Sequence, residues 1–156
     1  MLTRRAALAG LASIPLAGNV LAADGLVERR LHFAGRSINY LVRYAAPDVQ
    51  RPMLLCFGGG DANRGIAEYY ASVYTPESVY TDHHIILPIG PSNQRFFQFT
   101  DRDARAIVAA LIAAEPVEGR GLISGVSNGG RAAFRFAQAV PDAFRGFVTM
   151  PGAMGG

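Results

Sequence analysis

The chain has 156 residues, half of them hydrophobic, and this size and composition fit one small globular domain and exclude a disordered or fibrous protein. All 15 basic residues are arginines, against 12 acidic residues. Because Arg4 and Arg5 lie in a leader that we expect to be removed, the remaining chain is close to neutral. The charge balance therefore does not favour a surface that binds nucleic acid.

The first 22 residues have the features of an export signal. A charged start, Thr3-Arg4-Arg5, precedes an apolar stretch that glycine and proline interrupt, and small residues follow up to Ala22. The stretch is too short and too interrupted for a membrane span. The paired arginines resemble a twin-arginine leader, with a general secretory leader as the alternative. We therefore expect export machinery as a partner, cleavage after Ala22, and a mature domain over 23–156 that is periplasmic or secreted by a bacterium.

The mature chain begins with two runs that alternate polar and apolar residues, over 26–33 and 37–44. The turn signal Ala34-Gly35-Arg36 joins them, so we predict an antiparallel hairpin. The next run, MLLCF over 53–57, is continuously apolar, which is typical of a parallel strand that is covered on both faces. Three more short apolar runs resemble it and are also predicted strands: 85–87, 122–126 and 147–150.

Segments with the apolar spacing of helices lie between these strands. The residues that show this spacing are Ile66, Tyr69, Tyr70 and Val73; Ala104, Ile107, Val108 and Leu111; and Ala133, Phe136, Ala137 and Val140. Thr100 and Asp103 are spaced as a capping box at the start of the second helix. Strict alternation of strand and helix after an N-terminal hairpin predicts an α/β fold with three layers and a mostly parallel sheet.

The sequence GVSNG over 125–129 matches the pattern G-x-S-x-G where a predicted strand changes to a predicted helix. In such a turn the serine adopts a strained backbone conformation that exposes its hydroxyl at the carboxyl edge of the sheet, so we interpret Ser127 as a catalytic nucleophile. Gly125 and Gly129 leave room where the strand and the helix approach. The N–H of Asn128 can donate to a negative oxygen that develops on an attacked carbonyl.

The motif GVSNGG over 125–130, together with the glycines 58–60 after a strand, resembles the N-terminal half of an α/β-hydrolase. The similarity runs from about Leu26 to the end, and the motif is similar to that of secreted polyhydroxyalkanoate depolymerases and feruloyl esterases. The resemblance implies a three-layer α/β-hydrolase sheet. It also implies acyl transfer from carboxylic esters, either small molecules or polymers, without a cofactor.

The resemblance also implies a second donor for the oxyanion. In the superfamily, the loop that corresponds to the glycines 58–60, after the predicted strand 53–57, contributes one N–H. Gly59 is the candidate. Phe57 stands where related loops of the His-Gly-Gly-Gly type have histidine. The alternative is that the glycines 58–60 only form a sharp loop between a strand and a helix.

In α/β-hydrolases the nucleophile is followed along the chain by an acid and then by a histidine. Asp142 is the only carboxylate after Ser127, in a setting typical of a surface turn, and no histidine follows. We therefore expect a C-terminally truncated fragment that lacks the triad acid and base, with feeble catalysis. In such a fragment the run 147–150 becomes an apolar edge strand that favours aggregation. The alternative function is a non-catalytic ligand-binding module on the same scaffold.

Other candidate residues have ordinary explanations. His83 and His84 precede a strand and lie at its amino end, as surface or strand-end residues, whereas sites gather at carboxyl ends. Adjacent histidines on a strand also point to opposite faces, so no metal site is expected. His32 belongs to the hairpin, and Cys56 is interpreted as a buried apolar residue. The aromatic cluster over 96–99 is equally consistent with a substrate wall and with packing of the next helix.

Overall fold

The computed structural model of the chain describes residues 20–21, 25–74 and 82–151. The predicted export signal over 1–22 lies outside these residues, except that Val20–Leu21 form a short strand, β1. This strand pairs antiparallel with β2 (Leu26–Phe33). Among the described helices, none combines the length and the apolar character that crossing a membrane requires.

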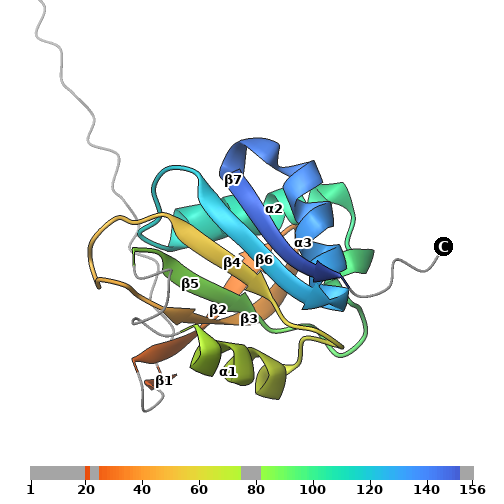
Figure 1. Cartoon of the computed structure of the whole chain (residues 1–156), viewed down its shortest axis with the longest axis horizontal. Coiled ribbons are helices and arrows are strands. Elements are labelled where there is room, and N and C mark those ends of the chain that lie inside the picture. Colours follow the sequence, from red (N-terminus) through yellow and green to blue (C-terminus); the bar gives the residue numbers. More distant parts are fainter. Residues whose placement is uncertain (1–19, 22–24, 75–81, 152–156) are drawn as a thin grey trace, which may run out of the picture.

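A mixed sheet of seven strands forms the centre of the molecule (Figure 1). β2 and β3 (Arg36–Arg43) form the predicted antiparallel hairpin, and its turn residues Ala34 and Gly35 have positive φ angles of 44° and 76°. β3 then pairs antiparallel with β5 (His84–Pro88). Three further strands follow β5 across the sheet and run parallel to it, in the order β4 (Met53–Phe57), β6 (Gly121–Ser127) and β7 (Phe144–Pro151).

Helices cover both faces of the sheet, which confirms the prediction of three layers. α1 (Arg64–Val73) packs on one face, and α2 (Asp101–Ala114) and α3 (Asn128–Ala139) pack on the other (Figure 1). Two short 3-10 turns complete the fold, η1 (Phe96–Gln98) before α2 and η2 (Pro141–Ala143) after α3.

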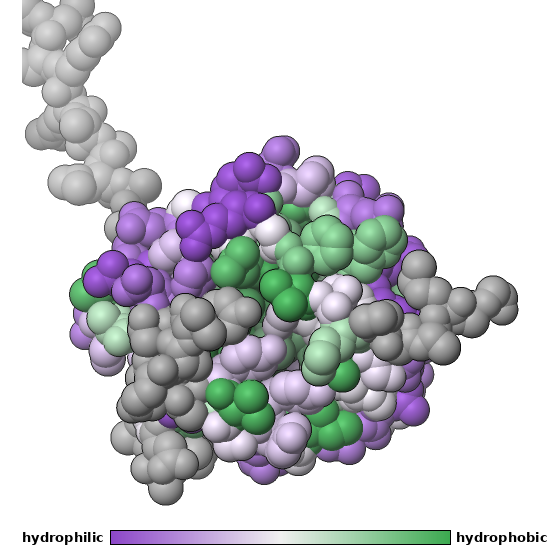
Figure 2. Space-filling view, in the orientation of Figure 1, coloured by the Kyte–Doolittle hydropathy of each residue, from purple (hydrophilic) through white to green (hydrophobic). Residues whose placement is uncertain are grey.

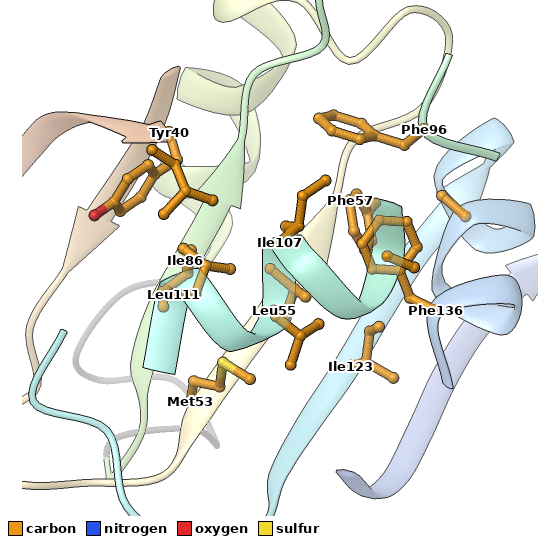
Figure 3. Close-up of a cluster of buried hydrophobic side chains, with 14 of the residues drawn as sticks. Tyr40, Met53, Leu55, Phe57, Ile86, Phe96, Ile107, Leu111, Ile123 and Phe136 are labelled. Atoms are coloured by element: carbon orange, nitrogen blue, oxygen red, sulfur yellow. The ribbon is translucent and has the colours of Figure 1, made fainter. Parts of the chain in front are cut away.

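The larger core lies between the sheet and the helices α2 and α3. Figure 3 shows Ile107 of α2 and Phe136 of α3 beside Leu55 and Phe57 of β4. All five side chains of β4 are buried, as a strand covered on both faces requires. The predicted capping box starts α2: Thr100 Oγ1 accepts from the Asp103 N–H at 3.1 Å, and Asp103 Oδ2 accepts from the Thr100 N–H at 3.1 Å.

The predicted apolar face of α1 is only partly correct. Tyr69 and Val73 were expected on that face, but they are 64% and 53% exposed. The helix instead buries Ala67 and Ala71 against the sheet. Apolar residues surround most of this helix, so their spacing alone does not identify which stripe meets the sheet, and the small alanines allow the closest approach.

β7 is the last strand at one edge of the described sheet, as expected for the run 147–150. Phe147, Val148 and Met150 are all more than half exposed. Hydrophobic atoms gather on the part of the molecular face where this strand lies (Figure 2). The ring of Phe147 packs edge-on against that of Phe134 from α3, with centroids 6.1 Å apart.

Candidate active site

The serine of the G-x-S-x-G sequence stands at the junction of β6 and α3. Ser127 is the last residue of β6 and the N-cap of α3, with φ 55° and ψ −120°. This conformation is costly for a residue other than glycine, by about 1–3 kcal/mol. The side chain is exposed and makes no capping hydrogen bond. The hydroxyl is therefore available, and the stability of the helix does not explain its position.

Close backbone contacts explain the glycines on either side of Ser127. A Cβ at Gly125 would lie 2.2 Å from the Gly129 carbonyl oxygen, and a Cβ at Gly129 would lie 2.1 Å from the Phe57 carbonyl oxygen. Both contacts are with backbone, which cannot rotate away. The sharp change from strand to helix therefore requires glycine at both positions.

The glycine loop at the end of β4 lies directly beside Ser127. Phe57 pairs with Gly125 in the ladder between β4 and β6, so the residues that follow the two strands are neighbours. A Cβ built on Gly59 would lie 3.3 Å from the Val126 carbonyl oxygen and 3.8 Å from Ser127 Cβ. The Asn128 side chain fixes this approach, because its Nδ2 donates to the Gly60 carbonyl oxygen at 3.0 Å.

Two backbone N–H groups at this junction are free to bind a ligand. Within the part of the chain that the structure describes, neither the Gly59 N–H nor the Asn128 N–H has a hydrogen-bond acceptor. The Asn128 N–H is the first of α3, where the helix dipole favours negative charge. Both residues lie close to Ser127: a Cβ on Gly59 would be 3.8 Å from Ser127 Cβ, and Asn128 is the next residue in the chain.

The topology of the sheet also marks this place. β4 lies between β5 and β6 in the sheet. After β4 the chain passes through α1 on one face to β5, and it then passes through α2 on the opposite face to β6, on the other side of β4. Such a switch point opens a crevice outside the carboxyl ends of the strands, where ligands of open α/β sheets bind. Ser127 and the glycine loop are both at this point.

The aromatic cluster after β5 packs the next helix onto the sheet, one of its two predicted roles, and the role as a substrate wall stays a prediction. Phe96 and Phe99 are buried in the core. Phe97 lines a crevice of about 10 Å³ together with Asn128 and Gly129, a volume near the lower limit for one water molecule. Its ring also carries the guanidinium of Arg131, 4.1 Å from the ring centre. The residue pattern does not predict this contact between Arg131 and Phe97.

The histidines lie away from Ser127. His84 starts β5 and pairs with Met53, so it is at the amino ends of the parallel strands. His83 precedes it, and its Nε2 contacts Arg145 Nη2 at 2.8 Å near the start of β7. His32 lies on β2, four strands from β6, or on the order of 19 Å at the usual strand spacing. No histidine of the chain is therefore placed beside the Ser127 hydroxyl.

The burial of two histidines differs from the expectation of ordinary surface or strand-end residues. His83 and His84 are 8% and 0% exposed. His84 Nδ1 accepts from the Ala45 N–H at 3.2 Å, and its Nε2 lies 2.9 Å from the Val49 carbonyl oxygen, so the ring holds a loop in place. Burial, followed by the nearby Arg145, lowers the pKa of His83.

Cys56 and Asp142 lie outside the site, as expected from the sequence. Cys56 is buried, and this burial raises the pKa of its thiol, so a reactive thiolate is disfavoured. Asp142 is exposed in η2, at the far end of α3 from Ser127. Among the described residues there is no group of three or more histidine, cysteine or acidic side chains that could hold a metal ion.

Comparison by sequence finds neither a matching family model nor a matching curated protein. Solved structures do match. The esterase Est22 superposes with a TM-score of 0.61 at 14% identity, over 84% of this chain and 45% of that one. An α/β hydrolase from Novosphingobium aromaticivorans superposes with a TM-score of 0.54 at 18% identity, over 82% of this chain and 45% of that one. An S-formylglutathione hydrolase from Staphylococcus aureus superposes with a TM-score of 0.57 at 15% identity, over 76% of this chain and 54% of that one.

This chain spans about half the length of these proteins. These matches, together with the strand order and the junction at Ser127, show that the chain has the α/β-hydrolase fold.

Proposed function

We propose that the chain is a serine hydrolase that acts on carboxylic esters, with Ser127 as the nucleophile. One observation carries the proposal: an exposed serine in a strained turn lies next to two backbone N–H groups, those of Gly59 and Asn128, that have no acceptor among the described residues. The esterase and hydrolase structures with the same fold support it.

The reaction is acyl transfer in two steps. Ser127 Oγ attacks the ester carbonyl carbon and passes its proton to a base from solution, and the carbonyl oxygen becomes an oxyanion that accepts from the N–H groups of Gly59 and Asn128. The oxyanion then re-forms the carbonyl, the C–O bond to the alcohol breaks, and the protonated base returns its proton to the departing alcohol. Water attacks the acyl-serine in the same manner, which releases the acid and restores the hydroxyl.

The base for this reaction is not provided by a histidine near Ser127, because all three histidines lie elsewhere in the fold. We therefore expect slow acylation by this chain alone. Oxyanion stabilisation and binding without a complete triad still leave acceleration of about 10³–10⁴ over water in serine proteases.

Acylation by p-nitrophenyl acetate tests the proposal. We expect the acetyl group on Ser127, found by mass spectrometry of the digested protein, and faster acylation when imidazole is added as an external base. Ser127→Ala should lose this acylation. Ser37→Ala, which removes an exposed hydroxyl on β3, should behave as the wild type.

Equal acylation of Ser127 and Ser37 in the wild type would contradict the proposal. It would instead support the alternative of a ligand-binding module. A fluorophosphonate probe gives a second readout, because it reacts with the same hydroxyl without requiring turnover.

We also propose that the chain is exported through the twin-arginine or general secretory machinery and acts in the periplasm or outside the cell. The support is the charged and apolar leader over 1–22. N-terminal sequencing of the protein recovered outside the cytoplasm should begin at Ala23. Arg4→Lys with Arg5→Lys should block export only on the twin-arginine route. Cytoplasmic protein with its leader intact would contradict this proposal.

A further inference from the structure

Arg131 is an arginine whose position the fold itself does not explain. It is the fourth residue of α3 and follows Ser127 by one helical turn. A cation near a helix N-terminus is opposed by the helix dipole. The side chain is nevertheless half-buried, with its guanidinium carbon 4.1 Å from the centre of the Phe97 ring.

Arg131 differs from nearby arginines in its contacts with the described part of the chain. Among the described residues its guanidinium has no carboxylate partner and no hydrogen-bond acceptor. Nearby arginines differ: Arg135 pairs with Asp101 at 3.3 Å, and Arg95 pairs with Asp61 at 3.6 Å. An arginine stacked on an aromatic ring keeps its N–H groups available for a carboxylate in the plane of the guanidinium.

The stacked pair adjoins the candidate active site. Phe97 lines the small crevice together with Asn128 and Gly129, and Asn128 is covalently next to Ser127. Arg131 follows Ser127 by four residues, a rise of about 6 Å along a helix, and residues with this spacing lie on the same side of the helix. The guanidinium is restricted by its stacking, so binding a ligand there costs less side-chain entropy than at a freely moving arginine.

We propose that Arg131 binds a carboxylate carried by the ester, so that the chain prefers half-esters of dicarboxylic acids to neutral diesters. The inference deepens the proposed function and rests on it for the ester itself. The binding of a carboxylate does not require acylation, and the two can be measured separately. Arg131 is therefore a specificity-determining residue beside the reacting group.

The test compares the binding of monomethyl succinate and dimethyl succinate to the whole chain by NMR titration. We expect the half-ester to bind about fivefold more tightly, the upper range for a partly exposed ion pair. The preference should decrease at high salt. The Arg131 Nε–H resonance should shift with the half-ester and not with the diester.

Variants localise the effect. Arg131→Gln should abolish the preference, whereas Arg102→Gln, which removes an exposed charge from α2, should keep it. Ser127→Ala should lose acylation but keep the preference, which separates this inference from the proposed function. A wild type without preference, an unshifted Arg131 Nε–H, or an Arg131→Gln variant that keeps the preference would overturn the inference.

Discussion

The Asn128 side chain donates a hydrogen bond from Nδ2 to the Gly60 carbonyl oxygen at 3.0 Å. The bond joins the first residue of α3 to the loop after β4, two segments that are 68 positions apart in the sequence. Gly59 directly precedes the bonded residue, so the bond ties the Gly59 loop to the start of α3. The proposed oxyanion geometry should therefore depend on the Asn128 side chain.

Replacing Asn128 by alanine should impair acylation more than stability. The backbone N–H of residue 128 remains, but the loop loses its tie and the Gly59 N–H loses its position. We expect acylation of Ser127 to slow by about tenfold to a hundredfold, the cost of small misplacements at reacting centres. The free energy of unfolding should fall by only about 1 kcal/mol.

Asn93→Ala is the matched control, because Asn93 is exposed in the loop before η1. It should acylate at the rate of the wild type. An unchanged acylation rate in Asn128→Ala would show that the bond to Gly60 does not position the site.

The strands of the fold were predictable because their residues are buried on one face or on both. The run 53–57 is continuously apolar because helices cover both faces of β4, and the hairpin alternates because it pairs at the side of the sheet. The face of α1 was less predictable, because Ala67 and Ala71 pack where Tyr69 was expected. Local spacing does not encode which stripe the neighbouring strands select.

The residues alone predicted the part of the candidate site that is local in sequence, and Gly59, which is distant in sequence, was named only through the family resemblance. The turn at Ser127 and the helix that follows are encoded by neighbouring residues. The bond of Asn128 to Gly60 and the stacking of Arg131 on Phe97 join segments that meet only after folding. Neither the types of these residues nor their spacing identifies their partners.

Replacing Gly125 by alanine should destabilise the chain strongly. The new Cβ would lie 2.2 Å from the Gly129 carbonyl oxygen and 2.3 Å from its carbon, so the strand and the helix must separate. We expect a loss of about 1–3 kcal/mol or more in the free energy of unfolding, measured by urea denaturation.

Gly65→Ala is the control for this change. A Cβ at Gly65 in α1 would be 3.5 Å from Asn63 Oδ1, an ordinary contact, and alanine favours the helix by about 0.5–1 kcal/mol. This variant should be as stable as the wild type or more stable. Equal stability of Gly125→Ala and the wild type would contradict the close approach of β6 and α3.

Replacing Ser127 by glycine should stabilise the fold relative to Ser127→Ala. The positive φ of 55° strains alanine and serine alike, whereas glycine adopts it readily. The hydroxyl makes no capping bond, so its removal costs the helix little. We expect Ser127→Gly to exceed Ser127→Ala by about 1 kcal/mol in unfolding free energy, with acylation lost in both. The reverse order, normal for a residue in a relaxed helix, would show that the turn carries no strain.

A buried polar cluster predicts how stability depends on alkaline pH. The Glu115 carboxylate is fully buried beyond the end of α2, accepts from the hydroxyls of Tyr40 and Tyr44, and lies 3.5 Å from Arg29 Nε. The distance from Tyr44 Oη to the carboxylate is 2.6 Å. Burial, together with the hydrogen bond to Glu115, raises the pKa of both tyrosines above the usual value of 10.0.

The folded chain therefore keeps protons on these hydroxyls at a pH where the unfolded chain releases them. The stability contributed by Tyr44 is fully present below about pH 10 and is lost as the pH rises further. Tyr44→Phe removes this contribution, so its unfolding free energy should fall less steeply between pH 9 and 11 than that of the wild type. The difference between the two slopes corresponds to at most about one proton released on unfolding. At pH 8 it should be less stable by about 1–3 kcal/mol, because Glu115 loses a donor.

Tyr69→Phe, at an exposed position, should keep the slope of the wild type. Urea denaturation across this range measures both effects, and identical slopes for Tyr44→Phe and the wild type would show that the bond to Glu115 does not hold the proton.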